Sequence, residues 1–222
     1  MPLHETEHSV ELTPNTLTKR CVIWCHGLGA DGYDFVPLAQ ELNLPDTHAT
    51  RFVFPHAPLM PVTFNQGMVM RAWFDIIDVR IDAKVDEIGV NQSKKRLHDL
   101  LEKELAAGIP AKHLYVGGFS QGAVMALTTG LAFSQPLGGI IALSGFLPHP
   151  DRFLKLANPA QQNTPIFLGH GRNDDIVPYH LGEESQGVLS KAGYAVTWKP
   201  YSMGHSVCPD EINDIRHWLL SH

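Results

Sequence analysis

Three features are scarce in this chain, and each shortage excludes a class of protein. Its three cysteines form no even set of disulfide partners. Lysine and arginine number 17 against 23 aspartates and glutamates, and with a formal net charge of -6 we expect no nucleic-acid partner. No run of about 18 apolar residues is present to span a membrane. Because the N-terminus is polar, acidic and unlike a secretion signal, we expect a cytoplasmic protein with reduced thiols.

Cysteine and histidine form no set with the spacing of a complete metal site. Cys21 and Cys25 lie in one apolar run, where an extended chain holds them about 13 Å apart, and no Cys-x-x-Cys pair is present. The chain has 13 histidines, but most have no ligand partner at a useful spacing. We therefore expect no bound metal.

Short apolar runs alternate with segments of helical periodicity. Runs rich in β-branched or aromatic residues predict strands at 21–25, 51–54, 113–116, 140–143, 166–168 and 196–198. Because nearly every position in these runs is apolar, they indicate strands buried on both faces, as in a parallel sheet. Helices are expected near 88–107, from Ser120 to Phe133, near 180–192 and from Pro209. The length fits a single α/β domain over residues 1–222.

Two further segments carry weaker patterns. Residues Ser9–Leu12 alternate polar and apolar side chains, which predicts an edge strand at the start of the sheet. Residues 55–86 contain Pro55, Pro58 and Pro61 beside several large apolar side chains. Apolar side chains on an irregular segment of this length indicate a binding loop or lid.

The segment 118–122 reads Gly-Phe-Ser-Gln-Gly and stands between an apolar strand and an apolar helix. A serine on such a sharp strand-to-helix turn projects its hydroxyl into solvent, and the flanking glycines remove Cβ atoms that would clash in the strained backbone. A nucleophilic serine needs a base, and the base needs an acid that orients it. The pattern therefore predicts Ser120 as the nucleophile of a serine hydrolase.

The downstream sequence offers both partners in the chain order serine, acid, histidine. Asp174 follows the strand at 166–168, and His205 follows the strand at 196–198, so both belong to loops at the carboxyl edge of the predicted sheet. We predict Asp174 as the acid and His205 as the base. Asp175 competes for the first role, and we expect it instead to cap the next helix. The alternative is a pair of turn aspartates without a catalytic role.

A tetrahedral intermediate also needs two backbone N–H donors for its oxyanion. Gln121, the residue after the nucleophile, supplies one, and the glycine-rich loop 26–30 suits the second, with Leu28 as the donor. An ordinary glycine turn is the alternative for that loop. His26 and His170 also follow strands, but each comes too early in the required order, so we expect both to brace loops by hydrogen bonds.

Together these motifs resemble the phospholipase/carboxylesterase family of α/β-hydrolases, which includes the acyl-protein thioesterases and small bacterial carboxylesterases. The similarity runs from about Cys21 to Trp218. It rests on the segments 26–31, 61–63, 72–76 and 117–122, on Asp174 with Val177-Pro178, and on Gly204-His205. The resemblance implies an α/β-hydrolase fold with a mostly parallel central sheet, helices on both faces and no large helical lid domain.

The resemblance also implies Ser120, Asp174 and His205 as the triad and the Leu28 and Gln121 amides as oxyanion donors. It implies hydrolysis of acyl esters, including lipid esters such as lysophospholipids, or of acyl-protein thioesters, without a cofactor. The segment matching 57–75 would form a loop beside an apolar acyl groove. The candidate groove residues, each equally explained by core packing, are Leu59, Phe64, Met68, Met70 and Trp73.

Some expectations stay open. Ala123 stands where many members have a second glycine, and we expect its methyl to tighten helix packing without touching the triad. Exposed apolar side chains near 57–75 fit an acyl groove, a homodimer, or contact with a membrane surface or an acyl-protein. The alternative function is a non-catalytic protein that binds acylated ligands on a hydrolase fold. The complete triad favours a serine carboxylesterase or thioesterase.

Overall fold

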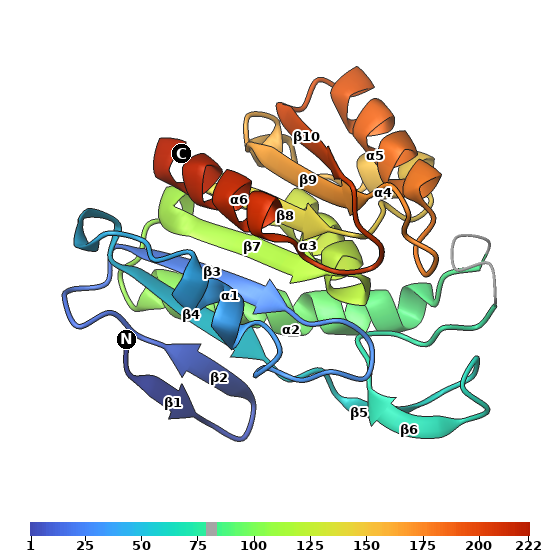
Figure 1. Ribbon diagram of the computed structural model, residues 1–222, viewed down its shortest axis with the longest axis horizontal. Coiled ribbons are helices and arrows are strands. Elements are labelled where there is room, and N and C mark those ends of the chain that lie inside the picture. The colour runs from blue at the N-terminus through green and yellow to red at the C-terminus, as the bar shows by residue number, and fades with distance from the viewer. Residues whose placement is uncertain (79–83) are drawn as a thin grey trace.

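The computed structural model describes residues 1–78 and 84–222 and is built around one twisted sheet (Figure 1). Within these ranges the sheet has eight strands in the order β1-β2-β4-β3-β7-β8-β9-β10. The strands are β1 (Leu3–Glu5), β2 (Ser9–Leu12), β3 (Arg20–Cys25), β4 (Thr50–Pro55), β7 (Leu114–Phe119), β8 (Gly139–Leu143), β9 (Ile166–Gly171) and β10 (Val196–Tyr201). Strands β4, β3, β7, β8, β9 and β10 are mutually parallel, whereas β2 is antiparallel to both of its neighbours.

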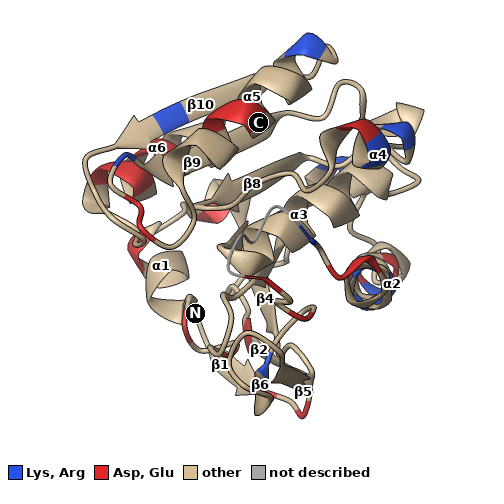
Figure 2. Ribbon diagram, turned by 90° about the vertical axis from the view of Figure 1, so that its right-hand side faces the viewer, with Lys and Arg blue, Asp and Glu red and all other residues tan. Residues whose placement is uncertain are grey.

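Helices cover both faces of the sheet. They are α1 (Val36–Glu41), α2 (Glu87–Ala106), α3 (Gln121–Ala132), α4 (Pro150–Lys155), α5 (Tyr179–Lys191) and α6 (Pro209–Ser221), with 3₁₀ turns at Asp46–His48, Ala111–His113 and Pro159–Gln161. Leu38 of α1 and Trp218 of α6 join one apolar cluster. Helices α2, α3 and α5 contribute to the other cluster, and Figure 2 shows α1 and α2 on opposite sides of the sheet.

The predicted patterns account for most of these elements. The apolar run at 21–25 is fully buried in the centre of the sheet, and α3 is buried from Gln121 to Leu131, as a helix between the sheet and its neighbours must be. The predicted α/β-hydrolase architecture is confirmed, without a large helical lid in the described ranges. Among the described helices, none combines the length and apolarity needed to cross a bilayer.

The predicted edge strand is wrong in one respect. Residues Ser9–Leu12 do form a strand, β2, but β1 pairs with it on the outside and is the actual edge. All residues of β1 are exposed, so its sequence carries no apolar alternation to reveal it. Backbone pairing with β2 places β1 at the edge, and such pairing leaves no mark in the sequence.

The segment 55–86 is also more regular than predicted. It contains a hairpin of β5 (Leu59–Val62) and β6 (Met68–Arg71), which forms a separate two-stranded sheet (Figure 1). Gln66 and Gly67, both with positive φ, form its turn. Proline is tolerated because a two-stranded sheet consists only of edge strands. Residues 79–83 of the predicted loop lie outside the described part of the chain.

Candidate active site

Three loops at the carboxyl edge of the parallel strands carry the predicted triad. Ser120 follows β7, Asp174 lies in the loop after β9, and His205 lies in the loop after β10. Strands β7, β8, β9 and β10 are successive neighbours in the sheet. Loops at one edge of neighbouring parallel strands come together whatever their separation in sequence, which is why ligand sites form there.

Ser120 has backbone angles of φ 56° and ψ -119°, a conformation that residues with a side chain rarely adopt. Its N–H donates to the Leu143 carbonyl at 2.9 Å, which holds the turn against β8. A Cβ at Gly122 would collide with the carbonyl oxygens of Cys25 and His26. Helix α3 thus approaches β3 as closely as glycine permits, and the strained strand-to-helix turn expected around Ser120 is present.

Asp174 and His205 are joined by a hydrogen bond of 2.8 Å between Asp174 Oδ2 and His205 Nδ1. The other carboxylate oxygen accepts from the Ile176 and Val177 amides at 3.0 and 2.8 Å. Burial acts to raise the pKa of Asp174, but the hydrogen bonds from His205 and these amides outweigh it, so the pKa lies below its ordinary value. The His205 ring packs on Phe119, the residue before the serine, with centroids 4.7 Å apart.

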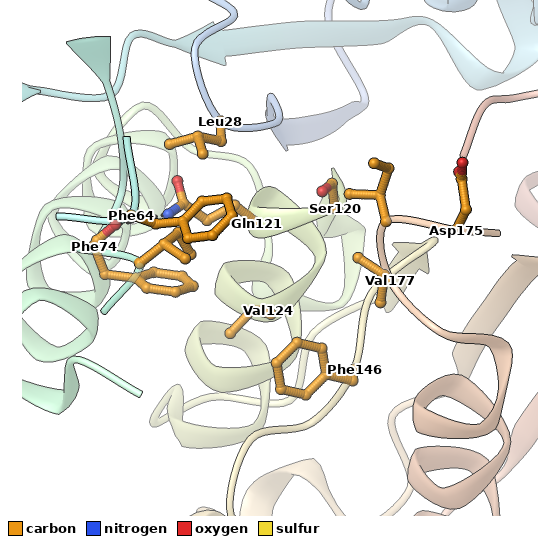
Figure 3. A pocket seen from close by; sticks show the side chains of 11 residues that line it. Leu28, Phe64, Phe74, Ser120, Gln121, Val124, Phe146, Asp175 and Val177 are labelled. Atoms are coloured by element: carbon orange, nitrogen blue, oxygen red, sulfur yellow. Dashed lines mark hydrogen bonds between the residues drawn. The ribbon is translucent and has the colours of Figure 1, made fainter. Parts of the chain in front are cut away.

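Asp175, the competing acid, points elsewhere. It lies at the rim of the cavity that contains Ser120 (Figure 3). The expectation that it caps a helix is wrong, because α5 begins at Tyr179 with Pro178 in the capping position and no side-chain cap. The turn is instead closed by the Asp174 carboxylate, which accepts amides two and three residues ahead in the chain.

His26 and His170 brace loops, as expected. His26 Nε2 accepts from the Ala57 amide at 3.1 Å, so its proton lies on Nδ1, which donates to the Gly27 carbonyl at 2.7 Å. His170 Nε2 bonds to the Val177 carbonyl at 2.9 Å. Burial lowers the pKa of His26 to about 4 and also lowers that of His170. Both rings are therefore neutral near pH 7.

The two predicted oxyanion donors lie at the same cavity as Ser120 (Figure 3). The Gly29 amide donates to the Arg71 carbonyl at 2.8 Å, which ties the loop 26–30 to β6. In the described part of the chain, no turn or loop carbonyl accepts a hydrogen bond from the amide of Leu28 or of Gln121. Both amides are thus available to a substrate oxygen.

An apolar cavity of about 300 Å³ opens beside Ser120 (Figure 3). Its lining residues are Leu28, Phe64, Phe74, Ile76, Ser120, Gln121, Val124, Phe146, Asp175, Ile176 and Val177. The volume stands at the lower end of the range of about 300 to 1,000 Å³ typical of small-ligand sites. Such a cavity can shelter an alkyl chain whose carbonyl end lies at the serine.

Only Phe64 of the predicted groove residues lines this cavity. Its amide donates to the Ile76 carbonyl at 2.8 Å, which turns the tip of the hairpin toward Ser120. Leu59 and Met68 lie on the same hairpin but project into solvent, with 65% and 64% of their surface exposed. Phe64 lies in the turn between the two strands, whereas Leu59 and Met68 lie on β5 and β6 themselves.

Met70 and Trp73 also lie outside the cavity lining. The Met70 sulfur accepts from Asn65 Nδ2 at 3.4 Å and thereby stabilises the hairpin turn. Trp73 is 2% exposed, and its indole N–H donates to the His26 carbonyl at 2.9 Å. For Trp73 the groove prediction is wrong, because the ring belongs to the core and its indole N–H is bonded to the loop 26–30.

One pair of histidines has a sequence spacing typical of metal ligands, but its backbone conformation does not suit a metal site. His4 and His8 have the spacing of two zinc ligands on one helical turn. Here His4 lies in β1 and His8 follows it in a bend, so no helix brings the rings to one face. Among residues 1–78 and 84–222, no group of three or more potential ligand side chains is arranged to hold a metal. All three cysteines are unpaired.

Comparison with known proteins agrees with this geometry. A family model described as phospholipase/carboxylesterase matches residues 7–222. The chain belongs to the phospholipase/carboxylesterase family. It is 39% identical to acyl-protein thioesterase 1 of Neurospora crassa over 207 residues, which cover 89% of this chain and 84% of that protein. The expected enzyme class, a serine hydrolase of carboxylic esters, is confirmed by these matches.

Other relatives extend the likeness to the fold. Acyl-protein thioesterase 1 of Yarrowia lipolytica is 38% identical over 203 residues, covering 89% of each chain. The crystal structure of acyl-protein thioesterase 2 from Zea mays superposes with a TM-score of 0.85 at 31% identity, and covers 96% of this chain and 97% of that one. Nearly the whole chain, and not only the serine motif, is thus shared with this phospholipase/carboxylesterase family.

Ala123 stands where many family members have a glycine, and a glycine on a neighbouring loop makes room for its methyl group. Ala123 is fully buried, and Gly145 of the loop after β8 lies directly against it. A Cβ at Gly145 would collide with the Ala123 methyl and would lie 3.0 Å from the Ser120 carbonyl oxygen. The methyl therefore fills space that a glycine on the neighbouring loop leaves open, without disturbing the serine.

The Gln121 side chain has a role that the sequence did not reveal. Its amide group donates to the Phe74 carbonyl at 2.7 Å and accepts from the Trp73 amide at 2.8 Å. Ser93 of α2 also bonds to the Trp73 carbonyl. These contacts fix the segment after the hairpin to the nucleophile turn. No spacing rule predicts them, because the partners are backbone groups 47 and 48 residues away.

Proposed function

We propose that this chain hydrolyses acyl esters or thioesters through a Ser120-His205-Asp174 triad. The observation that carries the proposal is the 2.8 Å hydrogen bond between Asp174 and His205, at the sheet edge where Ser120 occupies its strained turn. Asp174 is ionised, because its pKa lies below the ordinary value, and it holds the proton of His205 on Nδ1. The second nitrogen, Nε2, is then left to accept the serine proton.

Each step assigns one task to one group. His205 removes the proton of Ser120 as the hydroxyl oxygen attacks the acyl carbon, and the Leu28 and Gln121 amides bind the oxyanion that develops. His205 then gives the proton to the departing alcohol or thiol. Water, activated by the same histidine, releases the acid and restores Ser120. Hydrogen bonds between serine and histidine often tighten only with substrate bound.

The substrate class we propose is a small-molecule or lipid ester, or an acylated protein. The cavity of about 300 Å³ beside Ser120 suits the alkyl chain. The relatives named acyl-protein thioesterase favour thioester substrates among these. Leu59, Met68 and Val69 on the hairpin are more than 60% exposed, which supports contact of that surface with a membrane or with a second copy of the chain. A cytoplasmic location stays a prediction.

The experiment compares wild type with Ser120→Ala on p-nitrophenyl esters of two to sixteen carbons and on an acyl thioester. We expect an early burst from acyl-enzyme formation in wild type, and turnover at least 10³-fold lower in the variant at unchanged melting temperature. A fluorophosphonate probe should label wild type at Ser120 only. Failure of both labelling and turnover would favour the alternative, a non-catalytic protein that binds acylated ligands.

A further inference from the structure

A second cavity, of about 330 Å³, lies between α1 and α6 on the other side of the triad. His205 and Phe119 form part of its wall, together with Asp34, Phe35 and Glu41 from the segment around α1. It has no lining residue in common with the apolar cavity that contains Ser120. Ser120 and His205 thus face two different spaces, one on each side of the reacting centre.

The proposed mechanism assigns different parts of the substrate to these two spaces. The acyl carbon must lie at Ser120, with its alkyl chain in the apolar cavity. The departing oxygen or sulfur must lie at His205, because the histidine donates a proton to it. What is attached to that atom extends away from the acyl chain. The cavity bordered by His205 is therefore in place to receive the leaving group.

The lining of this second cavity combines aromatic and acidic groups. The Phe35 and Phe119 rings lie 5.5 Å apart, and Asp34 and Glu41 supply carboxylates, with no lysine or arginine in the lining. In the described part of the chain neither carboxylate forms an ion pair. Asp34 and Glu41 are both exposed to solvent, so their negative charges are open to an approaching cation. Burial, and less strongly the nearby charge of Asp31, raises the pKa of Asp34.

We propose that the cavity between α1 and α6 binds the leaving group and selects alcohols and thiols that carry a positive charge on a short apolar stem. This inference rests on the proposed function. Carboxylates attract the charge, and aromatic faces accept the methylene or methyl groups around an ammonium. Two sources share this chemistry, an ammonium alcohol and a cysteine thiol beside a basic residue in a peptide.

The cation takes no part in bond changes. The bond between the acyl carbon and the leaving oxygen or sulfur breaks, and that atom takes the proton that His205 received from Ser120. The acyl group remains on Ser120 until water removes it as the acid. The positive charge is unaltered throughout, so it contributes only to binding and orientation of the leaving group.

The test uses two esters of the same acyl chain, the choline ester and the 3,3-dimethylbutyl ester, which is its uncharged carbon isostere. We expect kcat/KM to favour the choline ester about 3- to 10-fold at low salt, and the ratio to approach one at high salt. The variants Asp34→Asn and Glu41→Gln should each lower the ratio, and the double variant should bring it near one. A ratio of two rate constants cancels differences in the folded fraction.

Glu102→Gln is the matched control, because Glu102 is an exposed acid on α2, on the opposite face of the sheet. It removes the same charge and should leave the ratio unchanged. A ratio near one in wild type, or an equal fall in Glu102→Gln and Glu41→Gln, overturns the inference. Turnover of both esters that depends on Ser120 keeps the proposed function intact in that case, whereas no turnover of either refutes the function itself.

Acylated cysteine peptides distinguish the two kinds of leaving group, the ammonium alcohol and the cysteine thiol beside a basic residue. One peptide places lysine next to the cysteine thioester, and its partner places norleucine there. Preference for the lysine peptide, lost in the double variant, assigns the cavity to acylated proteins. Preference for the choline ester alone assigns it to small ammonium alcohols. Absence of both preferences overturns the inference.

Discussion

The loops around Ser120 and the β5-β6 hairpin stand on either side of one cavity and are built in opposite ways. The serine turn is strained, with Ser120 partly exposed, and is held by hydrogen bonds to β8 and to the segment after the hairpin. The hairpin is a two-stranded sheet with exposed apolar side chains, among them Leu59, Met68 and Val69. Atoms that move protons need fixed positions, whereas a wall that encloses an alkyl chain needs only apolar surface.

The largest effect should separate the two aspartates of the acid loop. Asp174→Asn should lower kcat by up to about 10⁴-fold, because an amide stabilises the wrong tautomer of His205. Asp175→Asn, at the cavity rim, should change kcat less than about 5-fold. Steady-state kinetics on one p-nitrophenyl ester compares both. A larger loss for Asp175→Asn would assign the acid to the other residue.

A methyl group added at one glycine should lower activity, whereas a methyl group added at another should stabilise the fold. Gly122→Ala drives a Cβ into the carbonyl oxygens of Cys25 and His26, so α3 must shift, and we expect kcat to fall about 100-fold. Gly187→Ala, at an exposed position of α5 where a Cβ meets open space, should stabilise the fold by about 0.5–1 kcal/mol through helix propensity. Melting curves and kinetics on both variants measure this. Normal activity in Gly122→Ala would show that the serine turn is less rigid than its contacts indicate.

Acid should weaken the oxyanion loop through His26. Its pKa of about 4 lies below the ordinary value of 6.5. Between pH 4 and 6.5, His26 is therefore protonated in the unfolded chain and neutral in the folded chain. The stability from neutral His26 is therefore complete above pH 6.5, and about 3 kcal/mol is lost as the pH falls to 4. Urea unfolding at pH 7, 5.5 and 4.5 tests this against His26→Gln, whose stability should vary less. Equal slopes in both proteins would exclude His26 as the cause.

The smallest effects should come from the hairpin. Phe64→Ala removes an aromatic wall from the acyl cavity and should lower kcat/KM about 10-fold for esters of ten or more carbons, with little change for acetate. Met68→Ala, on an exposed side chain, should change neither by more than about 2-fold. The chain-length profile measures both. Equal losses on short and long esters would mean that Phe64 supports the loops and does not contact the alkyl chain.

The sequence predicted the serine turn well because its requirements are local. A strained residue between close-packed segments needs serine and glycine at fixed positions, and Gly122 lies where any Cβ would clash. The buried strands were equally visible, since burial on both faces demands an apolar residue at nearly every position. Their order in the sheet then places the loops of Ser120, Asp174 and His205 together, although their catalytic roles, like the single domain over 1–222, stay predictions.

The cavity wall was not predictable in the same way. Trp73 and Phe64 are both aromatic residues of one irregular segment, yet one supports the oxyanion loop and the other lines the cavity. Val124 and Phe146 also line the cavity, although the sequence around them is typical of buried core. Which face of a buried residue meets empty space depends on how the elements pack, and no single segment of the sequence specifies that.

The backbone of Ser120 also sets a trade-off between stability and activity. A residue with φ 56° and ψ -119° costs of order 1–3 kcal/mol that glycine would not incur. Replacing the nucleophile by glycine should therefore give a more stable protein with no turnover. A chain that only bound acylated ligands would gain by this exchange and would have no reason to keep serine there. The proposed catalytic role accounts for the strain that Ser120 carries.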